Sequence, residues 1–155
     1  MDFKEKLAYI RGTSLFEILQ MEILEGLVLK AESDGNNVAF VGKFEQSAEG
    51  APGLELKVPF LIAQTTEQIK KLGEGVLEGK VYELGRFALI KGTVNPAEVR
   101  FEKRYIMPDS DQRKINPNPI RYLGFNQDDG IYKGGWGFNS KGSEMETKGT
   151  FIMVR

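Results

Sequence analysis

Residues 130–155 read GIYKGGWGFNSKGSEMETKGTFIMVR, and this stretch indicates the fold. It holds two runs, IYKGGWGFN and GTFIMVR, in which large apolar residues alternate with small or polar ones, and a polar segment separates them. Alternate residues of a β-strand share one face, so each run predicts a strand with one apolar face. The residues expected on these two faces are Tyr132, Gly134, Trp136, Phe138, Phe151 and Met153.

The same alternation recurs upstream between glycine-rich turns. Its clearest instance is EVRFEKRYI (98–106), which places Val99, Phe101, Lys103 and Tyr105 on one face. The turn NPAE (95–98) joins this strand to LGRFALIKGTV (84–94) as a hairpin.

About eight such strands follow one another across residues 1–155, which we interpret as one domain. The run predicts an all-β, up-and-down antiparallel β-barrel or a sandwich. A closed barrel is favoured because it leaves no edge strand unpaired. The core is expected to include Phe87, Phe101, Tyr105, Trp136, Phe138 and Phe151.

One or two short helices are expected in the N-terminal half. In residues 13–26, Ser14 and Glu17 have the spacing of a capping box, and Gly26 is a candidate C-terminal stop. Residues 19–23 also alternate as a strand would, so helix and strand both stay open for residues 15–25.

A second capping box predicts a single helical turn further along the chain. Thr65 and Gln68 have the required spacing, and the turn is expected to run to Leu72 and to stop at Gly73.

Composition excludes several kinds of chemistry. The chain has 21 Lys and Arg against 22 Asp and Glu, and this balance gives no electrostatic case for nucleic acid. It contains no Cys and no His, which excludes disulfides, thiol nucleophiles, Ser-His triads and His-ligated zinc or haem. We therefore expect no cofactor, no metal site and no catalytic residue of these kinds.

The sequence also lacks the features of secreted and membrane proteins. The start, MDFKEKLAYIRG, does not have the apolar run of a secretory signal. No stretch approaches the ~20 apolar residues of a membrane helix. We expect a cytoplasmic protein without membrane insertion. Whether it forms a homo-oligomer is left open.

Five short motifs from residue 85 onward resemble the last strands of calycin-type barrels, the group of avidin-like and lipocalin-like proteins. They are Gly85-Arg86-Phe87, Phe101-Glu102-Lys103-Arg104-Tyr105, Tyr122-Leu123-Gly124, Gly134-Gly135-Trp136 and Gly149-Thr150-Phe151. The resemblance implies a binding protein that holds a small apolar or amphipathic ligand inside the barrel. The single Trp departs from avidins, and the absent disulfides depart from secreted lipocalins, so no particular ligand carries over.

Lys103 is the most suggestive residue because it interrupts an apolar strand face. A buried ammonium needs a partner, and a ligand carboxylate or phosphate would supply one. Alternatively, Lys103 reaches the barrel rim or pairs with an internal Glu. Trp136 is either a platform for a ligand or a core residue whose N–H bonds a backbone carbonyl. The predicted ligand-binding residues are Phe101, Lys103, Tyr105, Tyr122, Tyr132 and Trp136.

Three functional classes remain open on this sequence. The first is a carrier or sensor that binds a small apolar or amphipathic ligand with an acidic head inside the barrel. The second is a cofactor-free isomerase or cyclase, which would need a pocket carboxylate such as Glu83 or Glu102. The third is a protein-interaction module with a solid core. A ligand-sized cavity would separate the first two from the third, and a buried carboxylate that faces the cavity would favour the enzyme.

Overall fold

The computed structural model describes residues 18–47, 55–71, 75–107, 114–115, 119–128, 130–139 and 145–155. In chain order, the helices and strands of these residues are α2 (Ile18–Ser33), β1 (Asn37–Ser47), β2 (Glu55–Gln64), α3 (Thr66–Lys71), β3 (Val76–Glu83), β4 (Arg86–Val94), β5 (Glu98–Met107), β6 (Lys114–Ile115), β7 (Ile120–Asp128), β8 (Ile131–Asn139) and β9 (Met145–Val154).

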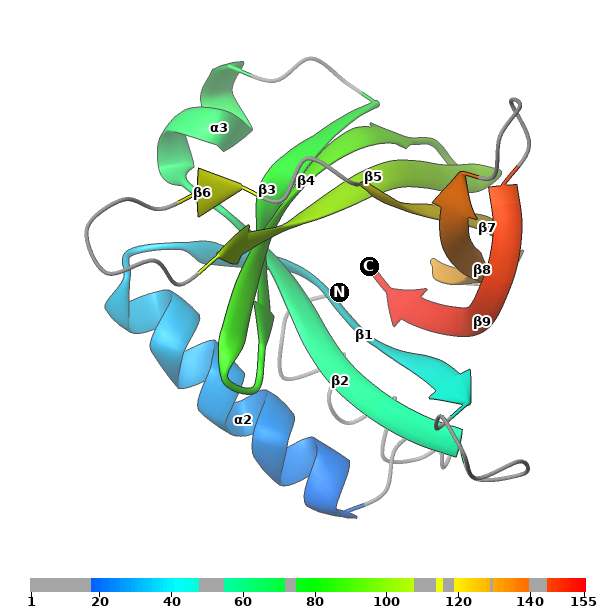
Figure 1. Cartoon of the computed structure of the whole chain (residues 1–155). Coiled ribbons are helices and arrows are strands. Elements are labelled where there is room, and N and C mark those ends of the chain that lie inside the picture. The colour runs from blue at the N-terminus through cyan, green and yellow to red at the C-terminus, as the bar shows by residue number, and fades with distance from the viewer. Residues whose placement is uncertain are drawn as a thin grey trace.

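Eight of the strands form a closed antiparallel barrel (Figure 1). Each strand from β1 to β5 pairs with the next, β5 pairs with β7, and the series continues through β8 to β9. The barrel closes where β9 pairs with β1, and the short β6 pairs only with the end of β5. The predicted up-and-down barrel is therefore confirmed.

The middle of the barrel is filled with aromatic rings. Phe101 stacks on Tyr122 with ring centroids 4.6 Å apart, and both rings meet the edge of Phe151. Phe40 and Tyr132 form a further edge contact. Large side chains from both halves of the chain thus fill this part of the interior, as is usual in small barrels.

Glycine in the opening stretch makes room for Trp136. A Cβ atom on Gly149 would lie 2.5 Å from the indole nitrogen of Trp136 and 2.1 Å from the carbonyl oxygen of Glu45. Because Gly149 has no side chain, the ring lies over the backbone and donates its N–H to Glu45 at 3.0 Å. The N–H of Trp136 therefore bonds a backbone carbonyl, as the core interpretation of this residue expected.

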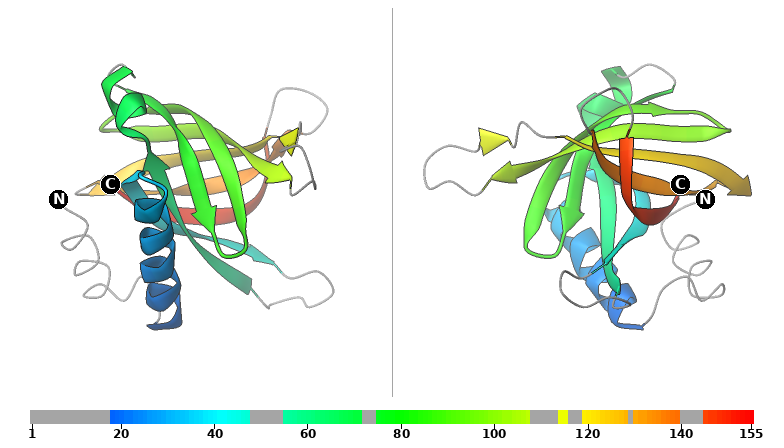
Figure 2. Two further views of the ribbon diagram at one scale, coloured as in Figure 1. Left: turned by 90° about the vertical axis from the view of Figure 1, so that its left-hand side faces the viewer. Right: turned by 45° about the vertical axis from the view of Figure 1, so that its right-hand side comes forward.

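Residues 18–33 form a helix, which settles residues 18–25 of the segment whose structure was left open by the sequence; residues 15–17 lie outside the described residues. Helix α2 lies against the outside of the barrel and contacts β1, β2 and β3 (Figures 1 and 2). Its buried residues, Met21, Leu24, Leu27, Val28 and Ala31, join outward-facing residues of the barrel in a second core. Each outward face that α2 covers is therefore apolar rather than polar.

The expectation that Gly26 ends this helix was wrong, because α2 continues to Ser33. The chain leaves the helix at Gly35, which has φ +80°. The N–H groups of Gly35 and Asn36 donate to the carbonyls of Glu32 and Ala31, as at other glycine-ended helices. The proposed N-terminal box at Ser14 and Glu17 lies outside the described residues.

The second capping box is present. The backbone N–H of Thr65 donates to the Gln68 side-chain oxygen at 2.9 Å, and the N–H of Gln68 donates to the Thr65 hydroxyl at 3.0 Å. Helix α3 follows directly, and the expected stop at Gly73 lies outside the described residues. Neither described helix has the length and apolar character needed to cross a membrane.

The predicted core was right in part. Phe101, Trp136 and Phe151 are buried inside the barrel. Phe138 was placed wrongly: it is 41% exposed, because it lies at the end of β8 where the barrel opens. Phe87 packs on the outer core beneath α2 rather than in the interior, and Tyr105 is only partly buried.

Candidate functional site

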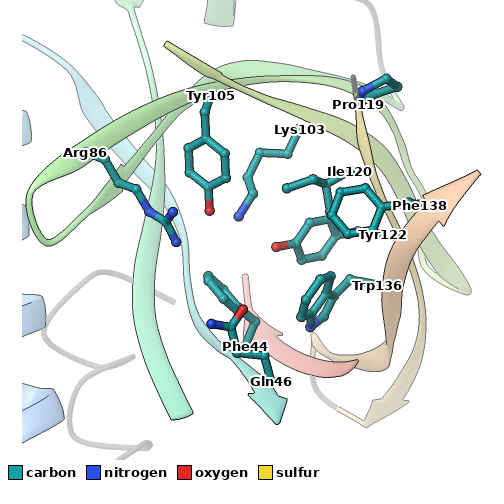
Figure 3. Close-up of a pocket in the computed structure, with 10 residues that line it drawn as sticks. All are labelled: Phe44, Gln46, Arg86, Lys103, Tyr105, Pro119, Ile120, Tyr122, Trp136 and Phe138. Atoms are coloured by element: carbon teal, nitrogen blue, oxygen red, sulfur yellow. The ribbon is translucent and has the colours of Figure 1, made fainter. Parts of the chain in front are cut away.

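A pocket of about 570 Å³ opens at one end of the barrel, where β1, β5 and β8 end and β4 and β7 begin. We call it the mouth pocket. Side chains from β1, β4, β5, β7 and β8 line it, and Figure 3 shows them gathered around a common space. The lining residues are Phe44, Gln46, Arg86, Lys103, Tyr105, Pro119, Ile120, Tyr122, Trp136 and Phe138.

The inner wall of the mouth pocket carries a buried charge cluster. The Lys103 ammonium lies 2.9 Å from one Glu83 oxygen, and the Arg86 Nε lies 2.9 Å from the other. The Tyr105 hydroxyl donates to the same carboxylate at 3.0 Å. Glu83 and Lys103 are both almost fully buried, whereas Arg86 is about half exposed. Two cations thus share one anion.

The register of three adjacent strands assembles this cluster. Glu83 ends β3 and Arg86 begins β4, and the two-residue turn between them contains Gly85 at φ +80°. Lys103 and Tyr105 face inward from β5, on the other side of β4. The inward residue of β4 beside Tyr105 is Ala88, whose small side chain lets groups on β3 and β5 meet.

The Lys103 ammonium is also surrounded by aromatic rings. It lies 4.4 Å from the ring centroid of Phe44, 4.7 Å from that of Tyr105 and 5.0 Å from that of Tyr122. Contacts of this length attract a cation to the face of a ring. The rings also replace water around the amine, so the positive charge of Lys103 is stabilised mainly by the Glu83 carboxylate.

Burial is the main cause of a lowered pKa at Lys103. It disfavours the ammonium form, the Glu83 carboxylate opposes this effect, and the nearby Arg86 adds to it. The resulting pKa of Lys103 is about 8.

The two pocket tyrosines keep their protons more firmly than a free phenol. Burial raises the pKa of Tyr105 and of Tyr122, and the negative charge of Glu83 acts in the same direction. Their hydroxyls therefore remain hydrogen-bond donors at neutral pH. The hydroxyl of Tyr122 points toward the space between Lys103 and Trp136 in Figure 3 and forms no hydrogen bond with another described residue.

The structure brings four of the six predicted ligand residues together. Lys103, Tyr105, Tyr122 and Trp136 line the mouth pocket. Phe101 does not line it, because it lies behind the Tyr122 ring. Tyr132 does not either, since its hydroxyl donates to the carbonyl of Asn95 at 2.8 Å, in the turn at the opposite end of the barrel.

Lys103 has an internal partner, which was one of the two sequence interpretations. The partner is Glu83, one of the two carboxylates considered for an enzyme. The other, Glu102, faces away from the pocket, where it pairs with Arg104 at 3.0 Å and Arg121 at 3.3 Å.

Sequence reasoning missed several lining residues, of which Arg86 matters most for charge. The spacing of Glu83 and Arg86 on either side of a tight turn was a usable signal, because paired strands place such residues directly opposite each other. Phe44 could have been found from the alternation of β1. The remaining missed residues are Gln46, Pro119, Ile120 and Phe138.

No family model, curated protein or solved structure matches this chain. The closed eight-stranded antiparallel barrel is compatible with a calycin-like fold. Because there is no matched protein from which a role can be transferred, function has to be argued from the mouth pocket itself.

Proposed function

We propose that the protein is a calycin-type binding protein that holds a small amphipathic anion in the mouth pocket. The observation that carries the proposal is an aromatic pocket whose inner wall has two cations and one anion. A ligand carboxylate, sulfonate or phosphate would balance this excess of positive charge.

Arg86 is the group best placed to meet such a head group. Its Nε is bound to Glu83, while about half of its side chain stays exposed at the pocket. A guanidinium has five N–H donors, so one contact to Glu83 leaves others for a second anion. The hydroxyl of Tyr122 adds a neutral donor deeper in the pocket.

The size and walls of the pocket favour a compact ligand with a ring. A volume of about 570 Å³ lies within the ~300–1,000 Å³ range of small-molecule sites. Trp136, Phe44 and Ile120 offer apolar surface, and each Å² of apolar ligand surface removed from water contributes about 25 cal/mol. The filled centre of the barrel argues against a long chain that threads through the interior, so the ligand belongs at the mouth.

The same geometry disfavours the enzyme alternative. A general base needs a free lone pair near the substrate. Glu83 already accepts hydrogen bonds from Lys103, Arg86 and Tyr105, which occupy both of its carboxylate oxygens. We therefore interpret Glu83 as a fixed counter-ion. The mouth pocket also disfavours the third class, a module whose barrel is solid throughout.

The test compares two fluorescent probes that differ by one charged group. 1-Anilinonaphthalene-8-sulfonate is anionic, and N-phenyl-1-naphthylamine is its neutral analogue. Trp136 is the only Trp of the chain and lines the pocket, so energy transfer from its emission to the bound probe reports occupancy. We expect saturable binding of the anionic probe with a stoichiometry of one, and weaker binding of the neutral probe.

Arg86→Gln separates the charge from the shape of the site. It should weaken the anionic probe by about 5- to 10-fold, the effect of roughly 1 kcal/mol at a half-exposed charge, and leave the neutral probe unchanged. Arg100→Gln is the matched control, since Arg100 lies on β5 but is well exposed away from the mouth pocket. Absence of saturable binding, or equal losses for both probes, would contradict the proposal.

A further inference from the structure

Lys103 presents a primary amine in a setting that is unusual for lysine. The side chain is buried, yet it lines the mouth pocket, and its Nζ lies within about 5 Å of three ring centroids. Lysines of this kind are rare, because an ammonium normally keeps its water. The amine is thus reachable by a ligand in the pocket and shielded from bulk solvent.

The titratable groups that face this amine come from four strands. The charged ones are the Glu83 carboxylate of β3 and the Arg86 guanidinium of β4. The remaining titratable ones are the hydroxyls of Tyr105 on β5 and Tyr122 on β7, which stay protonated at neutral pH. Desolvation and a neighbouring cation are the two means by which proteins make a lysine nucleophilic, and both are present here.

The unprotonated amine is therefore available near neutral pH. With a pKa of about 8, roughly a tenth of Lys103 is neutral at pH 7, which is several hundred times the fraction of an ordinary lysine.

We propose that Lys103 captures an aldehyde as a covalent imine at the inner wall of the mouth pocket, with Glu83 as its counter-ion. This goes beyond reversible binding of an anion. It uses the same pocket as the proposed function but needs no anionic head group.

The reaction balances without a further reagent. The Nζ lone pair forms a bond to the carbonyl carbon, and the carbonyl π electrons move to oxygen, which takes up a proton to give a carbinolamine. The hydroxyl then leaves as water while the C=N bond forms, so both amine hydrogens end on the departing oxygen. The proton that the Lys103 ammonium released before attack returns to the imine nitrogen. Nothing is oxidised or reduced, and the products are one protonated imine and one water.

Glu83 is placed to assist both steps. Its carboxylate lies 2.9 Å from Nζ, so it stabilises the positive charge on the nitrogen after attack and pairs with the protonated imine that forms. The Tyr105 hydroxyl, 3.0 Å from the same carboxylate, holds Glu83 in place. The rings of Phe44 and Tyr122 exclude water from the C=N bond, which slows its hydrolysis.

The pocket favours an aromatic or conjugated aldehyde. Its ring would lie among Trp136, Phe44 and Tyr122, whose rings prefer offset or edge contacts with another ring. Its carbonyl carbon has to reach a nitrogen enclosed on three sides, and an aldehyde is the least hindered carbonyl that can do so.

The experiment traps the imine in the full-length protein. Benzaldehyde is added at low concentration with cyanoborohydride at pH 7, which reduces an imine to a stable benzylamine, and the labelled lysines are mapped by peptide mass spectrometry. We expect Lys103 to be labelled at least tenfold faster than Lys91, a lysine of β4 whose side chain is 79% exposed. Lys103→Arg keeps the charge and should abolish the label at this position only.

A pH profile distinguishes reactivity from mere accessibility. Because Arg86 lowers the pKa of Lys103, Arg86→Gln should move the labelling profile of Lys103 to higher pH and leave that of Lys91 unchanged. A buried lysine without activation would show no such shift.

The outcomes separate this inference from the proposed function. If the sulfonate probe binds but Lys103 reacts no faster than Lys91, imine capture is wrong and anion binding stands. If Lys103 is labelled selectively but the sulfonate probe does not bind, anion binding is wrong and imine capture stands. Should Lys103→Arg fail to fold, the comparison of Lys103 with Lys91 in the wild-type chain still decides.

Discussion

Glu83→Gln should destabilise the barrel strongly, because the folded protein must then either keep the Lys103 ammonium buried without a negative charge or release its proton. Glutamine has almost the same shape and keeps an oxygen that can accept from Lys103. The change therefore removes charge with little change in packing. It also leaves Arg86 beside Lys103 with no anion between them, which disfavours the ammonium form of Lys103 further.

The expected cost follows from the burial of the pair. Both side chains are about 1–3% exposed, so neither charge is screened by water. Removing one partner of such a pair costs about 3–5 kcal/mol, while the whole free energy of unfolding of a domain is about 5–15 kcal/mol. A double variant, Glu83→Gln with Lys103→Met, removes both charges and should recover most of that loss.

The pH dependence gives an independent check. Burial holds the pKa of Lys103 at about 8, below its ordinary value of 10.5, so between these values the unfolded chain binds more protons and stability rises with pH. In Glu83→Gln the pKa falls further, because the carboxylate that raised it is gone. Below pH 8, Lys103 of the wild type is therefore protonated in both the folded and the unfolded protein. In the variant, Lys103 is protonated in the unfolded protein but not in the folded one. The stability difference between the two proteins should therefore widen as the pH falls below 8.

Urea unfolding followed by Trp136 emission and far-UV circular dichroism measures these free energies. The experiment needs wild type, Glu83→Gln and the double variant at several pH values between 6 and 9. An unchanged urea midpoint in Glu83→Gln would refute the placement of the charge cluster. So would a double variant that is no more stable than the single one.

Two further predictions concern packing. Phe101→Ala should lower the free energy of unfolding by about 3–5 kcal/mol, because the ring is buried between Tyr122 and Phe151. Phe125→Ala, at a position that is 51% exposed, should change it by less than about 0.5 kcal/mol, and equal urea midpoints for the two variants would contradict this prediction. Gly149→Ala should break the hydrogen bond of Trp136 and shift the Trp136 emission to the red; a blue-shifted or unchanged spectrum would count against this contact. Gly26→Ala, with open space around its Cβ inside α2, should raise the free energy of unfolding by about 0.5–1 kcal/mol.

The barrel could be predicted from the sequence because alternation reports directly on strand faces. Val99, Phe101 and Lys103 share an inward face, as their spacing requires. Alternation does not say whether the end of a strand is covered. Phe138 has the right parity for the core, but it follows a register shift between Trp136 and Gly137 and lies at the rim.

Helix α2 was ambiguous for a physical reason. It packs on the outer wall of a barrel, yet it also carries apolar residues on its solvent side: Leu19 is 66% exposed and Leu29 is 68% exposed. Apolar residues on both sides blur the 3.6-residue period from which a helix is recognised. The buried stripe that includes Leu24 and Val28 became visible only with the barrel in place.

The charge cluster was half predictable. The face of β5 required a partner for Lys103, but the choice of Glu83 depends on β4 lying between β3 and β5 and on Ala88 being small. A contact between residues 20 positions apart on strands that are not neighbours leaves no local pattern in the sequence. Arg86, which makes the cluster positive, enters only through the same hairpin.

The cost of this cluster is the reason to place function at the mouth pocket. Well-packed apolar residues in place of a buried ion pair are often as stabilising as the pair itself or more so, so folding alone does not require Glu83 and Lys103 here. The rest of the described interior is built from apolar and aromatic residues, with the polar cluster confined to the end that opens on the pocket. A barrel that served only as packed support could fill this end as it fills its centre. Two cations around one carboxylate, beside an aromatic space large enough for a small molecule, are better explained as a site that a negatively charged or carbonyl-bearing ligand completes.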